Sequence, residues 1–375
     1  MKILHVSKYY YPFIGGIEQV ARDCITSLQG NEQKIICFNH EKGTRTDIID
    51  GVEVIRVGCF AKIASQSLSM SYGKELKKVM NEFKPDVVIF HYPNPFASHF
   101  LLKYRKRNFK LFVYWHLDIY KQKLLKLFFH RQNKRLCKRA DVVVGATEKH
   151  IYESRYSKFF ENKAKVLPYA IDEDRLTLDA DAEKQIAQIK KENEGKIVLF
   201  AMGRHVPYKG LGYLIQASKL LGDEFKVYIA GEGPLTPELK EMSKDDKKVK
   251  LLGKIPTSTM LAYLNACDIF CFPSITRNEA FGIVQAEAMY FGKPVINFTI
   301  EHSGVNVVAT DGITGIEVEN RNVEKYADAI KELGGNEDLR KLYGGNAKER
   351  IHSTYTKKQF TEILKTIINE MMKYN

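Results

Sequence analysis

The sequence predicts an α/β protein with two domains, each built around a parallel β-sheet. The chain has 375 residues, which is long for one domain. Short apolar segments rich in β-branched residues alternate with helical stretches, a pattern typical of parallel strands joined by crossover helices. The alternation stops in an acidic, polar stretch at residues 172–194 and begins again at Lys196. Two sheets separated by a connector account for this interruption.

The predicted elements follow from apolar runs bounded by polar residues and from apolar residues three or four positions apart. Domains are expected at 1–170 and 171–355, with a C-terminal helix in 356–375. The helices expected most clearly are 17–29, 72–83, 213–221 and 359–372. The expected strands are 2–6, 34–38, 52–57, 87–91, 110–115, 141–145 and 165–168 in the first domain, and 197–202, 226–230, 249–252, 269–272 and 294–298 in the second.

Composition describes a globular protein with reduced cysteines. Hydrophobic residues make up 44% of the chain and charged residues 27%, which is enough for a sizeable core. The six cysteines form no C-x-x-C pair, so neither a zinc site nor a disulfide framework is indicated, and a cytoplasmic location fits. Met1 leads directly into a strand, so no signal peptide is expected. No run of about 18 apolar residues predicts a membrane span.

The net charge of +13 is concentrated in the first half of the chain. Residues 1–170 carry 30 lysines and arginines against 15 acids, whereas the remainder carries 28 against 30. The segment Lys103–Arg139 interleaves basic residues with leucines and phenylalanines, a mixture that suits an anionic membrane surface. An ordinary solvated face is an equal alternative, and nucleic acid is disfavoured because no nucleic-acid motif is present. The basic residues that carry the membrane hypothesis are Lys121, Lys123, Lys126 and Arg131.

The most informative segment is S-I-T-R-N-E-A-F-G-I-V-Q-A-E at residues 274–287, which follows an apolar strand. Glu279 and Glu287 bracket the start of a helix. N–H groups there can face a phosphate, because the first helical turn lacks intrahelical acceptors and carries the positive end of the dipole. Carboxylates in the same place can accept sugar hydroxyls. Phosphate donors beside hydroxyl acceptors predict a nucleotide-sugar site.

Three other loops carry candidate residues. Gly203-Arg-His-Val-Pro-Tyr-Lys-Gly210 follows a strand and offers the cations Arg204 and Lys209 to a leaving diphosphate, on which charge accumulates as the glycosidic bond breaks. Gly15-Gly16 can expose N–H groups to phosphate, or can be an ordinary tight turn. His116 follows the strand 110–115 and is either a sugar contact or a structural histidine.

The segment from Glu279 to Glu287 resembles the E-x7-E signature of the retaining glycosyltransferases of family 4, which have the GT-B fold. The resemblance runs from Gly15 to Gly292, and residues 91–95 and 115–123 are more narrowly similar to bacterial mannosyl and rhamnosyl transferases of surface polysaccharide assembly. It implies two Rossmann-like domains facing across a cleft, with the C-terminal helix crossing back onto the first domain.

The resemblance also implies roles for individual residues. Arg204 and Lys209 would clamp the diphosphate, while Glu279 would contact the donor sugar and Glu287 both ribose hydroxyls. His116 would contact the donor's 6-hydroxyl or an acceptor oxygen. The remaining implied donor contacts are Gly15 and Gly16 for phosphate, Gly203, Gly231 and Ile255 around the nucleotide, Ala280, Phe281 and Gly282 for sugar hydroxyls, and Ile283 and Val284 for phosphate.

Together with these residues, the resemblance implies a metal-independent, retaining transferase without a cofactor, cytoplasmic and peripheral on the inner face of the membrane. It would move a hexose, mannose favoured, from a nucleotide-diphosphate sugar such as GDP-mannose to a polysaccharide or lipid-linked acceptor, as in O-antigen assembly of lipopolysaccharide. The D-x-D pairs at 172–174 and 179–181 lie in the acidic connector, which argues against a metal site. The alternatives are a UDP-hexose-using transferase, an epimerase of the same fold, a phosphorylase-like enzyme and a non-catalytic binding protein.

Overall fold

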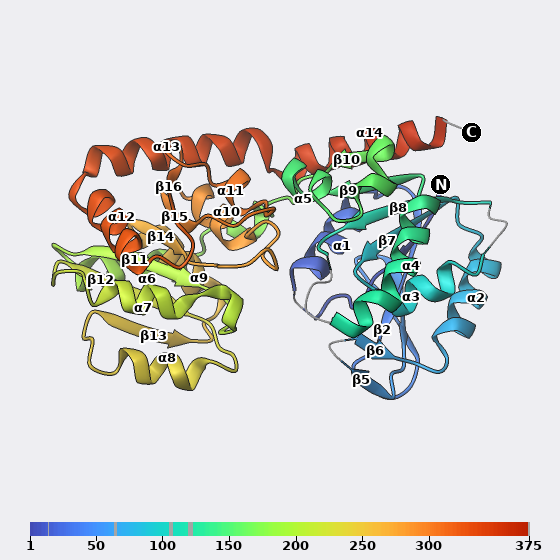
Figure 1. The fold of residues 1–375 in the computed structure, drawn as a ribbon, viewed down its shortest axis with the longest axis horizontal. Helices are drawn as coiled ribbons and strands as arrows, with labels where there is room; N and C mark the ends of the chain where they lie inside the picture. The colour runs from blue at the N-terminus through green and yellow to red at the C-terminus, as the bar shows by residue number, and fades with distance from the viewer. Residues whose placement is uncertain (14, 64–65, 105–107, 119–122, 374–375) are drawn as a thin grey trace. The chain divides into compact units, whose positions relative to one another are not determined.

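The structure is a computed structural model that describes residues 1–13, 15–63, 66–104, 108–118 and 123–373, with the backbone alone at Ile63 and at 123–128. Contacts divide the chain into two compact units, Met1–Ala170 with Lys357–Asn375, and Ile171–Thr356. Each unit is a Rossmann-like α/β domain with a mainly parallel sheet (Figure 1). The predicted fold class is therefore confirmed.

The sheet of the first unit runs in the order β10-β9-β8-β7-β1-β2-β4-β3. All neighbours pair in parallel except β3 and β4. A separate antiparallel hairpin is formed by β5 (Ala61–Ile63) and β6 (Gln66–Leu68). The strands of the sheet are β1 (Lys2–Val6), β2 (Glu32–Phe38), β3 (Arg45–Ile49), β4 (Val52–Val57), β7 (Val87–Tyr92), β8 (Lys110–Trp115), β9 (Val142–Gly145) and β10 (Ala164–Val166).

The antiparallel edge strand β3 departs from the all-parallel expectation. Its residues are mostly exposed, so the apolar pattern that marks a buried strand is missing. The turn that joins it to β4 is Asp50-Gly51, with φ angles of 52° and 77°. Asp-Gly is a strong hairpin signal because both turn residues must adopt positive φ. The hairpin was therefore detectable from its turn, although not from its strands.

Helices cover both faces of this sheet. The larger apolar core packs one face against α2 (Tyr72–Phe83), α3 (Pro95–Leu101), α4 (Lys123–Arg139) and α5 (Glu148–Tyr152). The opposite face is covered by α1 (Gly16–Ser27) and by α14 (Lys357–Lys373), the red helix lying with the blue and green elements in Figure 1. The final helix of the chain thus completes the first unit.

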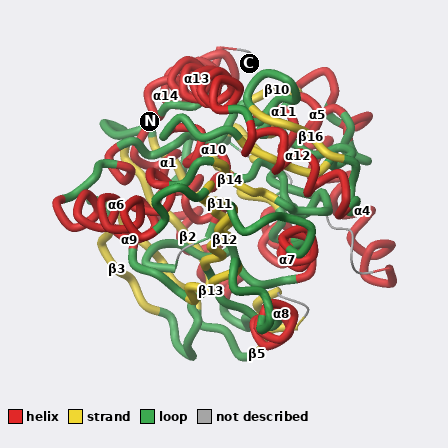
Figure 2. Tube along the Cα trace, turned by 90° about the vertical axis from the view of Figure 1, so that its left-hand side faces the viewer, coloured by secondary structure: helices red, strands yellow, loops and turns green. Residues whose placement is uncertain are grey.

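The second unit has the sheet order β13-β12-β11-β14-β15-β16, with all strands parallel. In Figure 2 the yellow strands of this sheet run between α6 and α9 on one side and α7 and α8 on the other. Its strands are β11 (Ile197–Met202), β12 (Phe225–Ala230), β13 (Val249–Gly253), β14 (Ile269–Phe272), β15 (Val295–Phe298) and β16 (Gly315–Val318). Its helices are α6 (Ala180–Glu192), α7 (Leu211–Ser218), α8 (Thr236–Ser243), α9 (Thr257–Ala266), α10 (Ile283–Tyr290), α11 (Val305–Val308), α12 (Val323–Gly335) and α13 (Glu337–Thr354).

The attachment of α14 to the first unit rests on its apolar face. Phe360, Leu364, Ile367, Ile368 and Met371 are buried at the expected helical spacing. Polar contacts support the packing at both ends of the helix: the Thr361 hydroxyl donates to Ser27 Oγ at 2.7 Å, and Lys165 pairs with Glu370 at 3.2 Å. These contacts tie the last helix to α1 and to the strand β10.

Replacing Leu364, which is fully buried, with alanine should destabilise the first unit by about 2–5 kcal/mol, through lost burial and the cavity left behind. Hydrogen–deuterium exchange should then rise in α1 and the sheet of the first unit, while α7 and α12 of the second unit stay protected. The neighbouring Lys365 is exposed, so Lys365→Ala is the control. Equal loss of protection in both units would contradict this assignment of α14.

Candidate active site

The second unit has its topological switch point between β11 and β14. From β11 the chain continues outwards to β12 and β13, and it then returns to β14 on the other side. Ligands of open α/β sheets bind beyond the carboxyl ends of the strands at such a point, because the two following loops diverge there. The loop after β11 contains Arg204 and Lys209, and the loop after β14 contains Glu279. Topology therefore brings the two predicted motifs to one edge of the sheet.

Glycines let these loops pack backbone against backbone. Gly231, after β12, has a φ of 121°, and a Cβ there would lie 1.9 Å from the carbonyl oxygen of Gly203. Gly210 has a φ of 61°, and its Cβ would lie 2.0 Å from the carbonyl oxygen of Pro273. Such approaches exclude any side chain. The loops after β11, β12 and β14 consequently form one rigid edge.

Lys209 and Glu279 form an ion pair across this edge, from Nζ to Oε2. Their side chains are only 13% and 15% exposed, so the pair is largely desolvated. The ammonium also lies 5.1 Å from the centre of the Phe272 ring, and the Ser274 hydroxyl donates to the same Glu279 oxygen at 3.4 Å. Arg204, in contrast, is exposed, and no described residue accepts a hydrogen bond from its guanidinium.

The backbone from Glu279 to Gly282 is held from the side. Ser303 Oγ donates to the carbonyl of Glu279 at 2.5 Å, and the Gly304 N–H donates to the carbonyl of Ala280 at 3.0 Å. Gly282, at a φ of 77°, then opens α10. The N–H groups of Ile283 and Val284 lie in the first turn, where no intrahelical acceptor exists. The helix start therefore presents donors beside the Lys209–Glu279 pair, and Phe281 is buried beneath it.

Glu287 lies one turn further along α10 and is buried, with 7% of its side chain exposed. Arg175 donates from a terminal guanidinium nitrogen to its Oε1 at 2.5 Å. The pKa of Glu287 is raised above its usual value, mainly by burial. Nearby Asp172 also raises this pKa, whereas the Arg175 charge offsets part of the increase. Arg175 was not expected from the sequence, because the two partners are separated by 112 positions.

The remaining nucleotide-side candidates of the second unit lie on the next loops. The Gly231 N–H donates to the Gly253 carbonyl at 2.8 Å, which joins the loops after β12 and β13. Ile255 follows this turn and is half-buried. His205, in the loop after β11, is fully buried against the loop after β12, with Nδ1 at 2.9 Å from Thr236 Oγ1.

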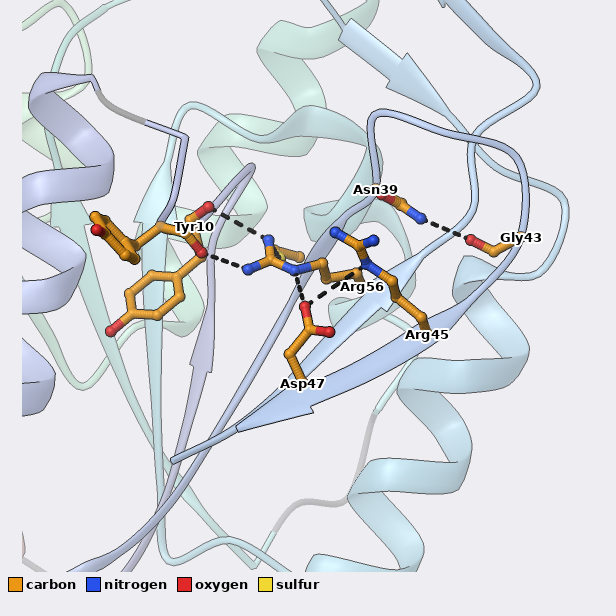
Figure 3. A network of polar contacts seen from close by, with 8 residues as sticks. Tyr10, Asn39, Gly43, Arg45, Asp47 and Arg56 are labelled. Carbon is orange, nitrogen blue, oxygen red and sulfur yellow. Dashed lines mark hydrogen bonds and ion pairs between the residues drawn. The ribbon is translucent and has the colours of Figure 1, made fainter. Parts of the chain in front are cut away.

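In the first unit, Gly15 and Gly16 precede and open α1, and Arg56 secures the loop before them. Arg56 is 4% exposed and donates to the carbonyls of Tyr10 and Tyr11 and, at 2.5 Å, to Asp47 (Figure 3). The guanidinium thus joins β4, β3 and the loop after β1. Sequence reasoning missed Arg56, since an arginine within a strand carries no local sign of its partners.

His116 is buried, with 1% of its surface exposed, and both of its ring nitrogens are hydrogen-bonded. Its Nε2 lies 3.0 Å from His91 Nδ1, and its Nδ1 lies 2.7 Å from the Tyr169 hydroxyl. Desolvation lowers its pKa to about 3, with His150 contributing. In this structure His116 therefore belongs to a buried chain of neutral rings rather than to an open surface.

Comparison with known proteins finds glycosyltransferase families along most of the chain. Residues 14–175 match Glycosyltransferase Family 4, and residues 182–350 match Glycosyl transferases group 1. Both models describe glycosyltransferases, and the chain is a glycosyltransferase. Of its glycosyltransferase relatives, O-antigen chain mannosyltransferase C of Escherichia coli is 27% identical over 95% of both chains. D-rhamnosyltransferase WbpZ of Pseudomonas aeruginosa is 28% identical over 95% of this chain and 92% of its own.

A solved structure confirms the GT-B fold of this glycosyltransferase. Sucrose-phosphate synthase from Thermosynechococcus elongatus superposes with a TM-score of 0.79 at 14% identity, covering 100% of both chains. Within the second unit, the structure brings together Lys209, Glu279 and the start of α10, with Arg204 on the same loop as Lys209. Gly15, Gly16 and His116 belong to the first unit. In the described part of the chain, no helix is both long and apolar enough to cross a membrane.

Buried neutral histidines should make the first unit sensitive to acid. His150 is 8% exposed, neither ring nitrogen has a hydrogen-bond partner, and desolvation lowers its pKa to about 4. The unfolded chain, with a histidine pKa of about 6.5, binds this proton first, so stability falls as pH drops from about 6.5 towards 4.

His150→Phe should remove this contribution. As the pH is lowered from 6 to 4.5, the unfolding free energy of the variant should rise relative to that of the wild-type protein by about 1.4 kcal/mol per pH unit. The measurement is a series of urea titrations in which hydrogen exchange reports unfolding of the first unit. A difference between the two proteins that does not vary with pH would contradict the assignment.

Proposed function

We propose that the chain is a retaining hexosyltransferase that uses a nucleotide-diphosphate sugar, with GDP-mannose the favoured donor. The observation that carries this proposal is the largely buried Lys209–Glu279 pair at the switch point, beside the free N–H groups of α10. A cation and helix-start donors suit a diphosphate, and a carboxylate suits sugar hydroxyls. The named mannosyl and rhamnosyl activities of two relatives support a hexose donor and a surface-glycan acceptor.

In the proposed reaction, the diphosphate takes Lys209 as its counter-ion, and Glu279 is thereby released to accept hydroxyls of the donor sugar. Arg204, the Ile283 N–H and the Val284 N–H add positive potential where charge develops on the leaving oxygen. The bond from the sugar's anomeric carbon to the diphosphate oxygen breaks with its electron pair going to that oxygen. The acceptor hydroxyl attacks from the same face, and its proton passes to the leaving phosphate.

We propose that these cations and dipoles stabilise the leaving group without a metal ion. Gly15, Gly16 and His116 stay the predicted contacts of the first unit, where His116 would have to exchange its bond to His91 or to Tyr169 for one to a substrate oxygen. The alternative donor is a UDP-hexose, because pocket shape rather than any single side chain would choose the base.

The enzyme is further proposed to work on the cytoplasmic face of the membrane, through the basic segment Lys103–Arg139. The support is the charge imbalance between the two halves of the chain. Lys121 lies outside the described residues, as do the side chains of Lys123 and Lys126, and Arg131 is exposed.

Lys209→Ala should lower kcat by about 10²–10³, because it removes a charge-assisted contact to the leaving group, worth about 2.7–4 kcal/mol. Arg204→Ala should have a similar effect. Lys219→Ala, at an exposed position after α7, is the matched control and should turn over normally. If both variants fold and their turnover is unchanged, the donor diphosphate does not bind at this site.

Donor choice should be read from ligand-induced stabilisation. A nucleoside diphosphate present at 100 times its Kd stabilises the native state by about 2.7 kcal/mol, so GDP, UDP and dTDP should raise the melting temperature in order of affinity, with GDP first. Incubating the preferred donor sugar without acceptor separates transfer from epimerisation, since an epimerase would convert the sugar to a new isomer. No response to any of the three diphosphates would refute the proposed function.

A further inference from the structure

We propose that Arg175 is a positioning residue that keeps the Glu287 carboxylate ionised and aimed at the donor's ribose. This inference rests on the proposed donor site and adds a residue that no motif in the sequence identifies. Arg175 lies in the short helical turn Asp174–Leu176, which follows directly on the start of the second unit. It approaches Glu287 from outside α10 and binds only Oε1 of the carboxylate.

The turn that carries Arg175 is anchored on both sides. Leu176 is 2% exposed and packs into the unit, while the Ile171 N–H donates to the carbonyl of Tyr355 at 2.7 Å. Ile171 also forms a parallel bridge with Thr356. The backbone of Arg175 is thus fixed between two anchored points, so the guanidinium reaches Glu287 from a defined direction.

A buried carboxylate without a cation would take up a proton, since desolvation penalises the charged form. Arg175 is the cation that pairs with Glu287 among the described residues, and Asp172 acts in the opposite sense. No described residue donates to the second oxygen, Oε2, which leaves it available to a ligand hydroxyl. An ionised carboxylate accepts at both oxygens, whereas a protonated one loses part of that capacity.

The cost of this arrangement indicates a role in binding. A buried ion pair recovers its desolvation penalty poorly, and a well-packed apolar pair is often as stable or more stable. The Arg175 side chain is nevertheless 38% exposed, whereas that of Glu287 is 7% exposed. Arg175 is therefore the open side of the pair, which a purely structural pair does not require.

The test uses the full chain and measures the Kd of GDP and of 2′-deoxy-GDP by calorimetry between pH 6 and 8.5, with UDP and its 2′-deoxy form run in parallel. The wild-type protein should prefer the ribose form about 10-fold or more, because an unpaired buried acceptor is costly. Arg175→Met should weaken binding of the ribose form about 10-fold and bring its preference over the deoxy form close to one. The loss should be greatest at low pH, where the unpaired Glu287 is protonated.

Three further variants separate positioning from a structural effect. Arg175→Lys should restore part of the ribose preference, since it restores a cation. Glu287→Gln should remove the preference, and adding Arg175→Met to it should cost little more, because the two residues act as one unit. Lys184→Met, at an exposed position on α6, removes the same charge and should change nothing.

The outcomes distinguish this inference from the proposed function. If the wild-type protein binds neither GDP nor UDP, the proposed donor site is wrong and the role of Arg175 falls with it. If both are bound normally and Arg175→Met keeps its ribose preference, or weakens the ribose and deoxy forms equally, only the role of Arg175 is overturned.

Discussion

The second unit of this glycosyltransferase depends on two places where backbone touches backbone. Gly231 lies against Gly203, and Gly210 lies against Pro273, at separations that no Cβ could occupy. These contacts lock three loops at the carboxyl edge of one sheet, and the loop after β13 is attached to them by a hydrogen bond to Gly253. They hold the loop that carries Lys209 beside the loop that carries Glu279, and the two side chains form an ion pair. The relative positions of these loops therefore depend on glycines at 210 and 231, where a side chain would not fit.

The acidic side chains of this edge are paired with basic ones. Lys209 pairs with Glu279 and Arg175 pairs with Glu287, so neither acid is left buried as an isolated charge. A ligand bound as proposed would exchange these partners: its phosphate would take the place of a carboxylate beside Lys209, and its hydroxyls would donate to the carboxylates. The ion pairs stabilise the same charged groups that the proposed donor would contact.

Local patterns in the sequence were sufficient for the fold class and for most strands, although not for β3. Apolar periodicity located the strands around β11 and β14, and the E-x7-E spacing placed Glu279 and Glu287 on either side of the start of α10. Arg175, Arg56 and the burial of His116 could not be predicted. Each depends on residues that come close only after the sheet has formed, such as Tyr169 beside His116. Pairing across distant segments leaves no periodic trace in one sequence.

The place of α14 in the chain has a consequence for synthesis. The face that α14 covers, on α1 and β8, is translated before the second unit, whereas α14 itself is translated after it. All of Ile171–Thr356 must be translated in between, which at about 5–20 residues per second takes on the order of ten seconds or more. The second unit is contiguous and can finish folding first. Until α14 is translated, the apolar surface of the first unit that it covers stays exposed to solvent.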